Sequence, residues 1–292
     1  MKPAISVIIN TKNEENNIRN CLQSLADQSY PLENLEIIVV DNNSTDKTRK
    51  IIEKFKGGNA LLDLKIFNQG PERSVQKNFG VRQSRGEYFI HLDADMTLGR
   101  EVIAECANKI AKNSRIVALY IPEIVLGNRF FSRVRRFERS FCNGTVIDGL
   151  RFIKKNEFIK AGGFDENLYA CEDWDLDKRL KKLGETDITK AVLYHNERQF
   201  NVRRYLKKKS YYSGNFSAYV KKWGKDDPDI KRQFGFYYRF LGIFIEKGKW
   251  KKLLAHPVLA FGMYWLRFLV GAIYFKKCHR ERNIVRRSNP RD

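Results

Sequence analysis

Short apolar runs alternate with amphipathic segments through the first 121 residues of the chain. Between Glu15 and Gln28, for example, the apolar residues recur at helical spacing. The apolar runs are rich in β-branched residues and apolar on both faces, which is typical of strands in a parallel sheet covered by helices on both sides. The pattern predicts strands over residues 5–10, 35–41, 64–67, 88–93 and 116–121, and helices over residues 15–28, 45–55, 73–83 and 101–111.

Polar side chains stand at the carboxyl ends of these predicted strands. Thr11 and Asn13 follow the first strand, Asp41 ends the second, and Asp93 ends the fourth. In open α/β sheets the ligand binds beyond the carboxyl ends of the strands. The sequence therefore predicts a single site at that edge.

Two carboxylates one residue apart, Asp93 and Asp95, follow the apolar run 88–92. Hard oxygen ligands of this kind suit Mg²⁺ or Mn²⁺, which stay partly hydrated and also bind substrate phosphates. An Asp-x-Asp triplet taken alone favours a solvated turn. Its position at the end of a predicted sheet strand favours a divalent-cation site instead.

Six short motifs resemble the glycosyltransferase family 2 enzymes with a GT-A fold, and the resemblance covers residues 4–197. In the family's order they are VIINTKNEE (7–15), VVDNNSTD (39–46), QKNFG (76–80), DAD (93–95), GGFDE (162–166) and EDWDL (172–176). The resemblance implies an α/β fold with a Rossmann-like, mostly parallel sheet flanked by helices. It also implies a nucleotide-diphospho-sugar donor and a Mn²⁺ or Mg²⁺ cofactor.

The resemblance further implies roles for individual residues. Thr11, Asn13 and Glu14 line the nucleotide pocket, Asp41 receives the base or ribose, and Gln76 and Asn78 belong to a donor-contacting segment. Asp93 lies near the ribose and the metal, Asp95 is the direct metal ligand, and Asp173 is the catalytic base. Lys77 departs from the family pattern, which commonly has arginine before the asparagine, and this leaves the donor contact of residues 76–78 open.

Sugar transfer explains why these residue types are needed. A metal held by carboxylates neutralises the charge that grows on the leaving diphosphate. The acceptor hydroxyl loses its proton to a second carboxylate, for which Glu172 and Asp173 are the candidates. A helix predicted from Trp174 onward places Asp173 near a helix N-terminus, where the dipole favours the ionised form. The alternative for this acidic segment is helix capping alone.

Two histidines lie near the predicted site. His195 follows the apolar residues 191–194 and can complete the metal site, although a histidine at a strand end is also commonly structural. His91 lies within the fourth predicted strand and out of phase with Asp93, which indicates a core or supporting residue.

The net charge of +21 is concentrated in the last third of the chain. Residues 199–292 hold 23 Lys and Arg against 6 Asp and Glu, whereas residues 1–198 hold 32 against 28. The same C-terminal segment contains 20 of the 37 aromatic residues. Basic residues interleaved with aromatic ones suit an anionic membrane surface or a nucleic acid.

An apolar stretch, Leu253–Phe275, favours the membrane. It is long enough to span a bilayer and is flanked by Lys249, Lys251 and Lys252 on one side and by Lys276 and Lys277 on the other. Arg267 near its middle, and basic residues at both ends, argue against a span. We expect an interfacial segment; a true span and a buried helix of a soluble protein or oligomer remain the alternatives.

Cysteine usage and the N-terminus bear on the compartment. The five cysteines are odd in number and form no Cys-x-x-Cys pair, which favours free thiols in a reducing compartment. The chain enters its first predicted strand almost at once, which leaves no room for a signal peptide. We therefore expect the cytoplasmic face of a membrane.

The sequence as a whole predicts a metal-dependent, inverting glycosyltransferase in two regions. Residues 1–198 form the catalytic domain, with nucleotide-sugar binding in 1–121 and the acceptor side in 122–198, and residues 199–292 form a basic helical region. The expected partners are a UDP-sugar, a lipid-linked or cell-envelope glycan and an anionic membrane surface. The alternatives are an inactive nucleotide-sugar-binding protein and a nucleic-acid-binding protein, which only the charge supports. A dehydrogenase is disfavoured because no Gly-x-Gly-x-x-Gly turn follows the first strand.

Overall fold

The computed structural model describes residues 2–288, with side chains described up to Phe275, so that Lys276 and Lys277 lie outside the described side chains. Packing divides the chain into two units. The sheet unit comprises the residues up to Leu126 together with Cys142–Asn196. The helical unit comprises Gly127–Phe141 and the chain from Glu197 onward.

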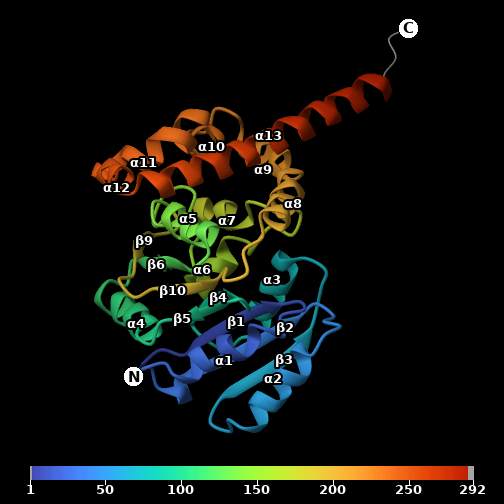
Figure 1. Cartoon of the computed structure of the whole chain (residues 1–292). Coiled ribbons are helices and arrows are strands. Elements are labelled where there is room, and N and C mark those ends of the chain that lie inside the picture. Colours follow the sequence, from blue (N-terminus) through green and yellow to red (C-terminus); the bar gives the residue numbers. More distant parts are fainter. Residues whose placement is uncertain (1, 289–292) are drawn as a thin grey trace. The chain divides into compact units, whose positions relative to one another are not determined.

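A seven-stranded sheet forms the centre of the sheet unit (Figure 1), in the order β3-β2-β1-β4-β8-β6-β9. A second sheet has the order β5-β10-β7. The strands are β1 (Ile5–Thr11), β2 (Leu35–Asp41), β3 (Asp63–Asn68), β4 (Tyr88–Asp93), β5 (Met96–Leu98), β6 (Ile116–Tyr120), β7 (Glu123–Leu126), β8 (Phe152–Lys154), β9 (Glu185–Ile188) and β10 (Leu193–Asn196). The helices are α1 (Ile18–Ala26), α2 (Thr48–Gly57), α3 (Arg73–Gln83), α4 (Val102–Lys112), α6 (Lys155–Lys160) and α7 (Glu172–Leu180).

The five predicted strands and four predicted helices are present, with ends that shift by a few residues. β1, β2, β3 and β4 pair in parallel as expected. The sheet is mostly parallel, as predicted, but it includes a strand that the sequence did not predict, β8, which lies antiparallel between β4 and β6. β8 is only three residues long, and so short a strand leaves no clear alternation in the sequence.

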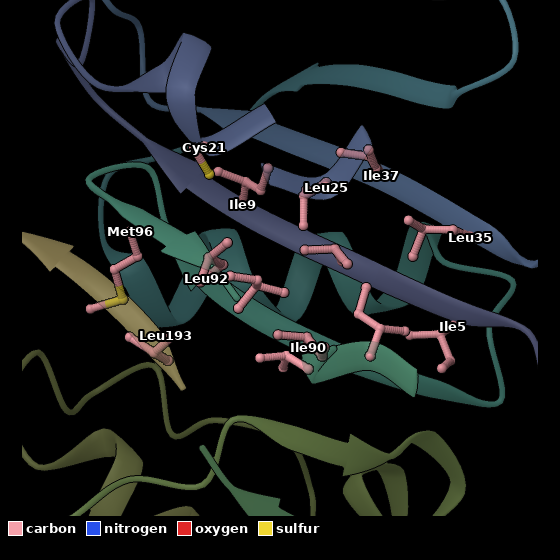
Figure 2. Packing of buried hydrophobic residues seen from close by; sticks show 14 of the residues in the cluster. Ile5, Ile9, Cys21, Leu25, Leu35, Ile37, Ile90, Leu92, Met96 and Leu193 are labelled. Atoms are coloured by element: carbon pink, nitrogen blue, oxygen red, sulfur yellow. The ribbon is translucent and has the colours of Figure 1, made fainter. Parts of the chain in front are cut away.

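Apolar side chains cover both faces of the large sheet, because neighbouring residues of a strand point to opposite faces. Val7 and Ile9 of β1 lie in one buried cluster with α1, α2 and α4, which Figure 2 shows in part. Ile8 lies in a second cluster on the other face, with residues of α3, α6 and α7. This two-sided burial explains the continuous apolar runs in the sequence.

The helical unit is built from α5 (Phe130–Arg139), α8 (Val202–Ser213), α9 (Phe216–Trp223), α10 (Pro228–Phe234), α11 (Ile243–Ile245), α12 (Trp250–Ala255) and α13 (Pro257–Ser288). α13 packs against α5 and α8. Gly262 permits a close approach, since a Cβ there would lie 2.7 Å from Cγ2 of Val134. Residues 127–141 therefore pack within the helical unit, whereas the sequence analysis groups them with the acceptor side of the catalytic domain. The functional division at residue 198 stays a prediction.

The contact between α3 and β1 offers a test of this packing. A Cβ on Gly80 would lie 2.3 Å from Cγ2 of Ile8, which is fully buried and β-branched. We predict that Gly80→Ala lowers the free energy of unfolding by about 1 to 3 kcal/mol through overpacking. Chemical denaturation measures the change. The matched control is Gly57→Ala at the end of α2, where no atom lies within 4 Å, and which should be neutral or slightly stabilising. Equal stability of the two variants would contradict the packing.

Candidate active site

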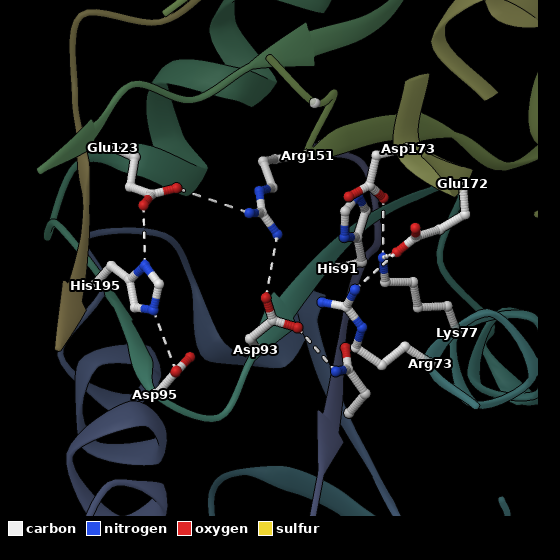
Figure 3. A network of polar contacts seen from close by, with 12 residues as sticks. Arg73, Lys77, His91, Asp93, Asp95, Glu123, Arg151, Glu172, Asp173 and His195 are labelled. Carbon is white, nitrogen blue, oxygen red and sulfur yellow. Dashed lines mark hydrogen bonds and ion pairs between the residues drawn. The ribbon is translucent and has the colours of Figure 1, made fainter. Parts of the chain in front are cut away.

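Asp93 and Asp95 lie where β4 gives way to β5, and side chains from other strands face both carboxylates (Figure 3). Asp93 Oδ1 accepts a hydrogen bond from Asn10 Nδ2 at 2.8 Å, and its Oδ2 is 3.9 Å from Nη1 of Arg151. Burial alone would raise the pKa of Asp93. The cations of Arg151, Arg73 and Lys77, with the Asn10 bond, outweigh burial and hold that pKa far below its usual range. Asp93 is therefore ionised.

His195 connects Asp95 to Glu123. Its Nε2 is 3.2 Å from Asp95 Oδ2, and its Nδ1 is 2.9 Å from Glu123 Oε1. The sequence placed His195 after a strand, but it lies within β10, paired with Met96 of β5 and Val125 of β7. Burial would lower the pKa of His195, yet the hydrogen bonds to Asp95 and Glu123 raise it to about 10. The imidazole is thus cationic at neutral pH, and a metal ion bound there would displace a proton.

The surroundings of Asp95 fit a divalent cation. Its Oδ1 is buried and has no hydrogen-bond partner among the described residues. A buried carboxylate oxygen without a partner is costly, and a cation would satisfy it. The contact of His195 Nδ1 with Glu123 is the carboxylate–histidine arrangement that orients metal-binding imidazoles. Residues 2–275 contain no group of three or more His, Cys, Asp or Glu side chains arranged to hold a metal, so substrate or water oxygens would complete the coordination.

A second ionic cluster lies at the start of α7. Lys77 Nζ of α3 is 2.9 Å from Asp173 Oδ1 and 3.4 Å from Glu172 Oε1. Arg73 Nη2 is 3.4 Å from the same Glu172 oxygen. The side chain of Asp173 is 28% exposed and that of Glu172 only 4%. Asp173 is therefore open to a ligand, whereas Glu172 is enclosed and pairs with both cations.

The charge state of Asp173 follows from its neighbours. Burial would raise its pKa, but the cations of Lys77 and Arg151 lower it well below the ordinary range, with a further contribution from the Lys77 hydrogen bond. Asp173 is thus ionised, as a base must be. The position predicted from the sequence is also observed, since Asp173 is the second residue of α7.

The predicted nucleotide-pocket residues gather around the ends of β1 and β2. Asn13, at a positive φ of 55°, accepts a hydrogen bond at its Oδ1 from the backbone amide of Thr45 at 2.8 Å, and its own backbone amide donates to Ser44 Oγ at 2.8 Å. Asp41 accepts from the backbone of Ser44 at 3.1 Å. The two bonds of Asn13 join the loop that follows β1 to the loop that follows β2.

Thr11 and Glu14 lie in the same region. Thr11 Oγ1 is buried and has no hydrogen-bond partner among the described residues, as expected of a group that binds a ligand. Glu14 accepts from Asn17 Nδ2 at 2.6 Å, and its backbone amide donates to Thr48 Oγ1 at 2.7 Å.

Gln76 and Asn78 are bonded mainly to the protein backbone. Gln76 Nε2 donates to the carbonyls of Thr11 and Val40 at 3.2 and 2.7 Å. Asn78 Nδ2 donates to the carbonyl of Phe164 at 2.9 Å, and its Oδ1 accepts from the Phe164 amide at 2.9 Å. Both side chains hydrogen-bond α3 to neighbouring segments. Their contact with the nucleotide-sugar donor stays a prediction.

His91 is a buried neighbour of Asp173. It is 1% exposed, and its Nε2 lies 2.6 Å from the carbonyl of Leu150. Burial, with Lys77, lowers its pKa to about 3. The imidazole is therefore neutral, which agrees with the expected core or supporting role.

Three charged residues of the site carried no motif in the sequence. Glu123 begins β7, Arg151 precedes β8, and Arg73 begins α3. Arg151 lies between two carboxylates, at 3.9 Å from both Asp93 and Glu123. Glu123 lies in a four-residue strand and Arg151 precedes a three-residue strand, and strands this short give no periodic signal, so only the tertiary structure shows these residues.

Comparison with known proteins agrees with this arrangement. The Glycosyl transferase family 2 model matches residues 6–165. Glycosyltransferase AglE of Haloferax volcanii is 37% identical over 263 residues, which are 84% of this chain and 82% of that protein. The dolichyl N-acetyl-alpha-D-glucosaminyl phosphate 3-beta-D-2,3-diacetamido-2,3-dideoxy-beta-D-glucuronosyltransferase of Methanococcus voltae is 25% identical over 269 residues, 82% of this chain and 81% of that protein.

Solved structures share the fold. The mannosyltransferase PcManGT of Pyrobaculum calidifontis, in complex with GDP-Man and Mn²⁺, has a TM-score of 0.63 at 21% identity, covering 94% of this chain and 86% of that one. Residues 1–349 of TarS from Staphylococcus aureus, in complex with UDP, have a TM-score of 0.59 at 18% identity, covering 95% and 91%. The predicted GT-A fold is confirmed.

Proposed function

This chain belongs to glycosyltransferase family 2, and we propose that it is a divalent-cation-dependent, inverting enzyme that transfers a sugar from a nucleoside diphosphate to a lipid-linked or cell-envelope glycan. The observation that carries the proposal is the separation of two acidic groups. Asp95 pairs with His195 and keeps one oxygen unsatisfied, whereas Asp173 belongs to a different ionic cluster and is open to a ligand. One group suits the leaving diphosphate and the other suits the acceptor.

On the acceptor side, Asp173 takes the proton of the attacking hydroxyl. The acceptor oxygen bonds to the anomeric carbon as the bond to the diphosphate breaks, and the diphosphate leaves with the bonding electrons. Attack opposite the leaving group inverts the configuration in a single displacement. Glu172, nearly buried between Arg73 and Lys77, holds these cations in place rather than meeting the substrate.

On the donor side, Asp95 and His195 are the residues that would hold Mn²⁺ or Mg²⁺, with Asp93 close by. The metal supplies Lewis-acid stabilisation of the departing diphosphate. The presence of Mn²⁺ and GDP-Man in PcManGT supports this role. Thr11, Asn13, Glu14 and Asp41 then receive the nucleoside.

The donor is proposed to be a UDP-sugar. TarS has been solved with UDP and with UDP-GlcNAc, whereas PcManGT has been solved with GDP-Man. Binding of UDP and of GDP, each measured with Mn²⁺, distinguishes the two bases. Stronger binding of GDP would overturn the choice of UDP.

The acceptor is proposed to be lipid-linked, and the enzyme to dock on the cytoplasmic face of a membrane. The Methanococcus voltae relative acts, by its name, on a dolichyl phosphate sugar. In the helical unit, α13 contains the stretch Pro257–Phe275, which is long and apolar enough to cross a membrane and is 22% buried. A core helix of a soluble protein would be mostly buried.

The two faces of α13 differ. Met263, Leu266 and Arg267 are buried within the helical unit, and Arg267 Nε lies 2.9 Å from Glu138 Oε1 of α5. A further set of large apolar side chains recurs at helical spacing and is exposed: Val258 (67%), Phe261 (73%), Trp265 (49%), Phe268 (62%) and Phe275 (73%). A helix bound to its own unit by one face and apolar on the other suits interfacial docking, with exposed lysines such as Lys247 and Lys251 to attract anionic lipid.

The metal assignment predicts the effect of Asp95→Asn, which keeps the size of the side chain but removes its charge. We expect Mn²⁺-dependent binding of UDP and sugar transfer to be lost, as measured by calorimetry and by a transfer assay. Asp187→Asn, at an exposed carboxylate paired with Lys109, is the control and should behave like the wild type. Full transfer by Asp95→Asn, or by the wild type in excess EDTA, would show that no metal acts here.

The base assignment predicts the effect of Asp173→Asn. Transfer should fall by roughly 10² to 10⁴, because the amide cannot accept the acceptor proton, while the Kd for the donor nucleotide barely changes. A transfer assay together with nucleotide titration separates the two effects. If nucleotide binding disappeared along with transfer, Asp173 would belong to the donor site.

The docking assignment predicts the effect of charges on the exposed face of α13. Phe261→Asp, Trp265→Asp and Phe268→Asp together should abolish sedimentation with phosphatidylglycerol vesicles at low salt and leave UDP binding intact. Leu61→Asp, at an 84% exposed apolar residue of the sheet unit, is the matched control. A wild type that stays in the supernatant would disprove docking. Conversion of a stable dimer to monomers by the triple variant would assign this face to a second copy of the chain.

A further inference from the structure

Lys77 is a charged residue without access to water. It is 1% exposed, and its ammonium group contacts Asp173 and Glu172 and lies 4.7 Å from the centre of the Phe164 ring. A buried ammonium is costly unless charged partners compensate for the lost water. Its position is therefore fixed by the two acidic residues that begin α7.

The contact with Asp173 involves one carboxylate oxygen. Lys77 Nζ lies 2.9 Å from Oδ1, and the side chain of Asp173 is 28% exposed. The backbone approaches closely at Gly149, where a Cβ would lie 3.3 Å from the Asp173 Cβ. Lysine binds as a point charge, whereas the two-pronged guanidinium of arginine pairs with both oxygens of a carboxylate. A lysine at this position thus leaves the second oxygen available.

The other groups that face Asp173 are His91 from β4, Arg151 from the segment before β8, and Glu172 beside it. His91 is neutral, and Arg151 is placed to pair with Asp93 and Glu123. Lys77 is the cation that contacts Asp173 directly (Figure 3).

We propose that Lys77 is a positioning residue that holds Oδ1 of Asp173, presents Oδ2 to the acceptor hydroxyl and balances the charge of the carboxylate. The inference rests on the proposed role of Asp173 as base. In the transfer step the proton passes from the acceptor oxygen to Oδ2, and Asp173 becomes neutral. Glu172, 3.4 Å from Nζ, keeps the ammonium paired at that moment.

The sign of the pH effect follows from the Coulomb attraction. Lys77 stabilises the ionised form of Asp173 and so lowers its pKa. Without that charge the pKa rises, and the acid limb of the kcat profile moves to higher pH. A direct opposite charge shifts a carboxylate by about 1 to 3 pH units, which sets the size of the expected movement.

The test compares the kcat–pH profiles of Lys77→Met and Lys77→Arg with that of the wild type, using membranes or lipid acceptor, donor sugar and Mn²⁺. Lys77→Met should shift the acid limb upward by about 1 to 3 units with the donor KM unchanged. Lys77→Arg keeps the charge and should retain the wild-type acid limb, but its guanidinium can pair with both oxygens of Asp173 and should therefore lower the plateau of kcat. Lys181→Met, which removes a lysine 2.9 Å from Asp177 on the same helix, is the matched control and should shift nothing.

An unshifted acid limb in Lys77→Met would overturn the inference, and a raised donor KM without a shift would make Lys77 a donor-binding residue. If Lys77→Met failed to fold, Lys77→Gln, which keeps a hydrogen-bond donor and removes the charge, should give the same shift. The proposed function fails by a different result, namely wild-type transfer by Asp173→Asn.

Discussion

Carboxylates stay ionised inside a protein only where cations or hydrogen-bond donors offset their loss of water, and the site depends on that constraint. Asp93 and Asp173 both have pKa values held low by neighbouring cations despite burial. The cations come from α3 and from the segment before β8, so the order of strands determines the charge state. A strand order that separated Arg151 from β4 would remove the largest of the attractions that offset the burial of Asp93.

The same pairing divides the site into two parts with different chemistry. Asp95 and Glu123 hold His195 between them, whereas Asp173 and Glu172 hold Lys77. A metal ion can replace the proton that His195 shares with Asp95, because both ligate divalent cations. Lysine is a poor metal ligand at neutral pH, so the second cluster suits proton transfer better than metal binding. One edge of a sheet can therefore serve leaving group and acceptor without one carboxylate competing for both tasks.

The sequence predicts the parts of this arrangement that local pattern encodes. The apolar runs indicate β1 to β4, and the Asp triplet after β4 indicates the edge at which the site forms. The sequence does not predict β8, the second sheet or the presence of Glu123 and Arg151 in the site. These features depend on strands of three or four residues whose pairing is set by distant contacts. The sequence also does not predict that the side-chain amides of Gln76 and Asn78 donate to backbone carbonyls, because these bonds form only in the folded chain.

The C-terminal helix shows why hydropathy alone is ambiguous. From the sequence, Arg267 reads as a charge within an apolar stretch and argues against a membrane span. In the structure Arg267 pairs with Glu138. Burial would raise the pKa of Glu138, but Arg267 and Arg135 lower that pKa to about 2. Arg267 therefore identifies the inward face of α13 and says nothing against lipid on the outward face. Removing Arg267 would leave Glu138 short of one cation within the helical unit and would not make the outer face more apolar. The apolar stretch thus has two faces, of which one packs α13 against α5 and α8 and the other is exposed.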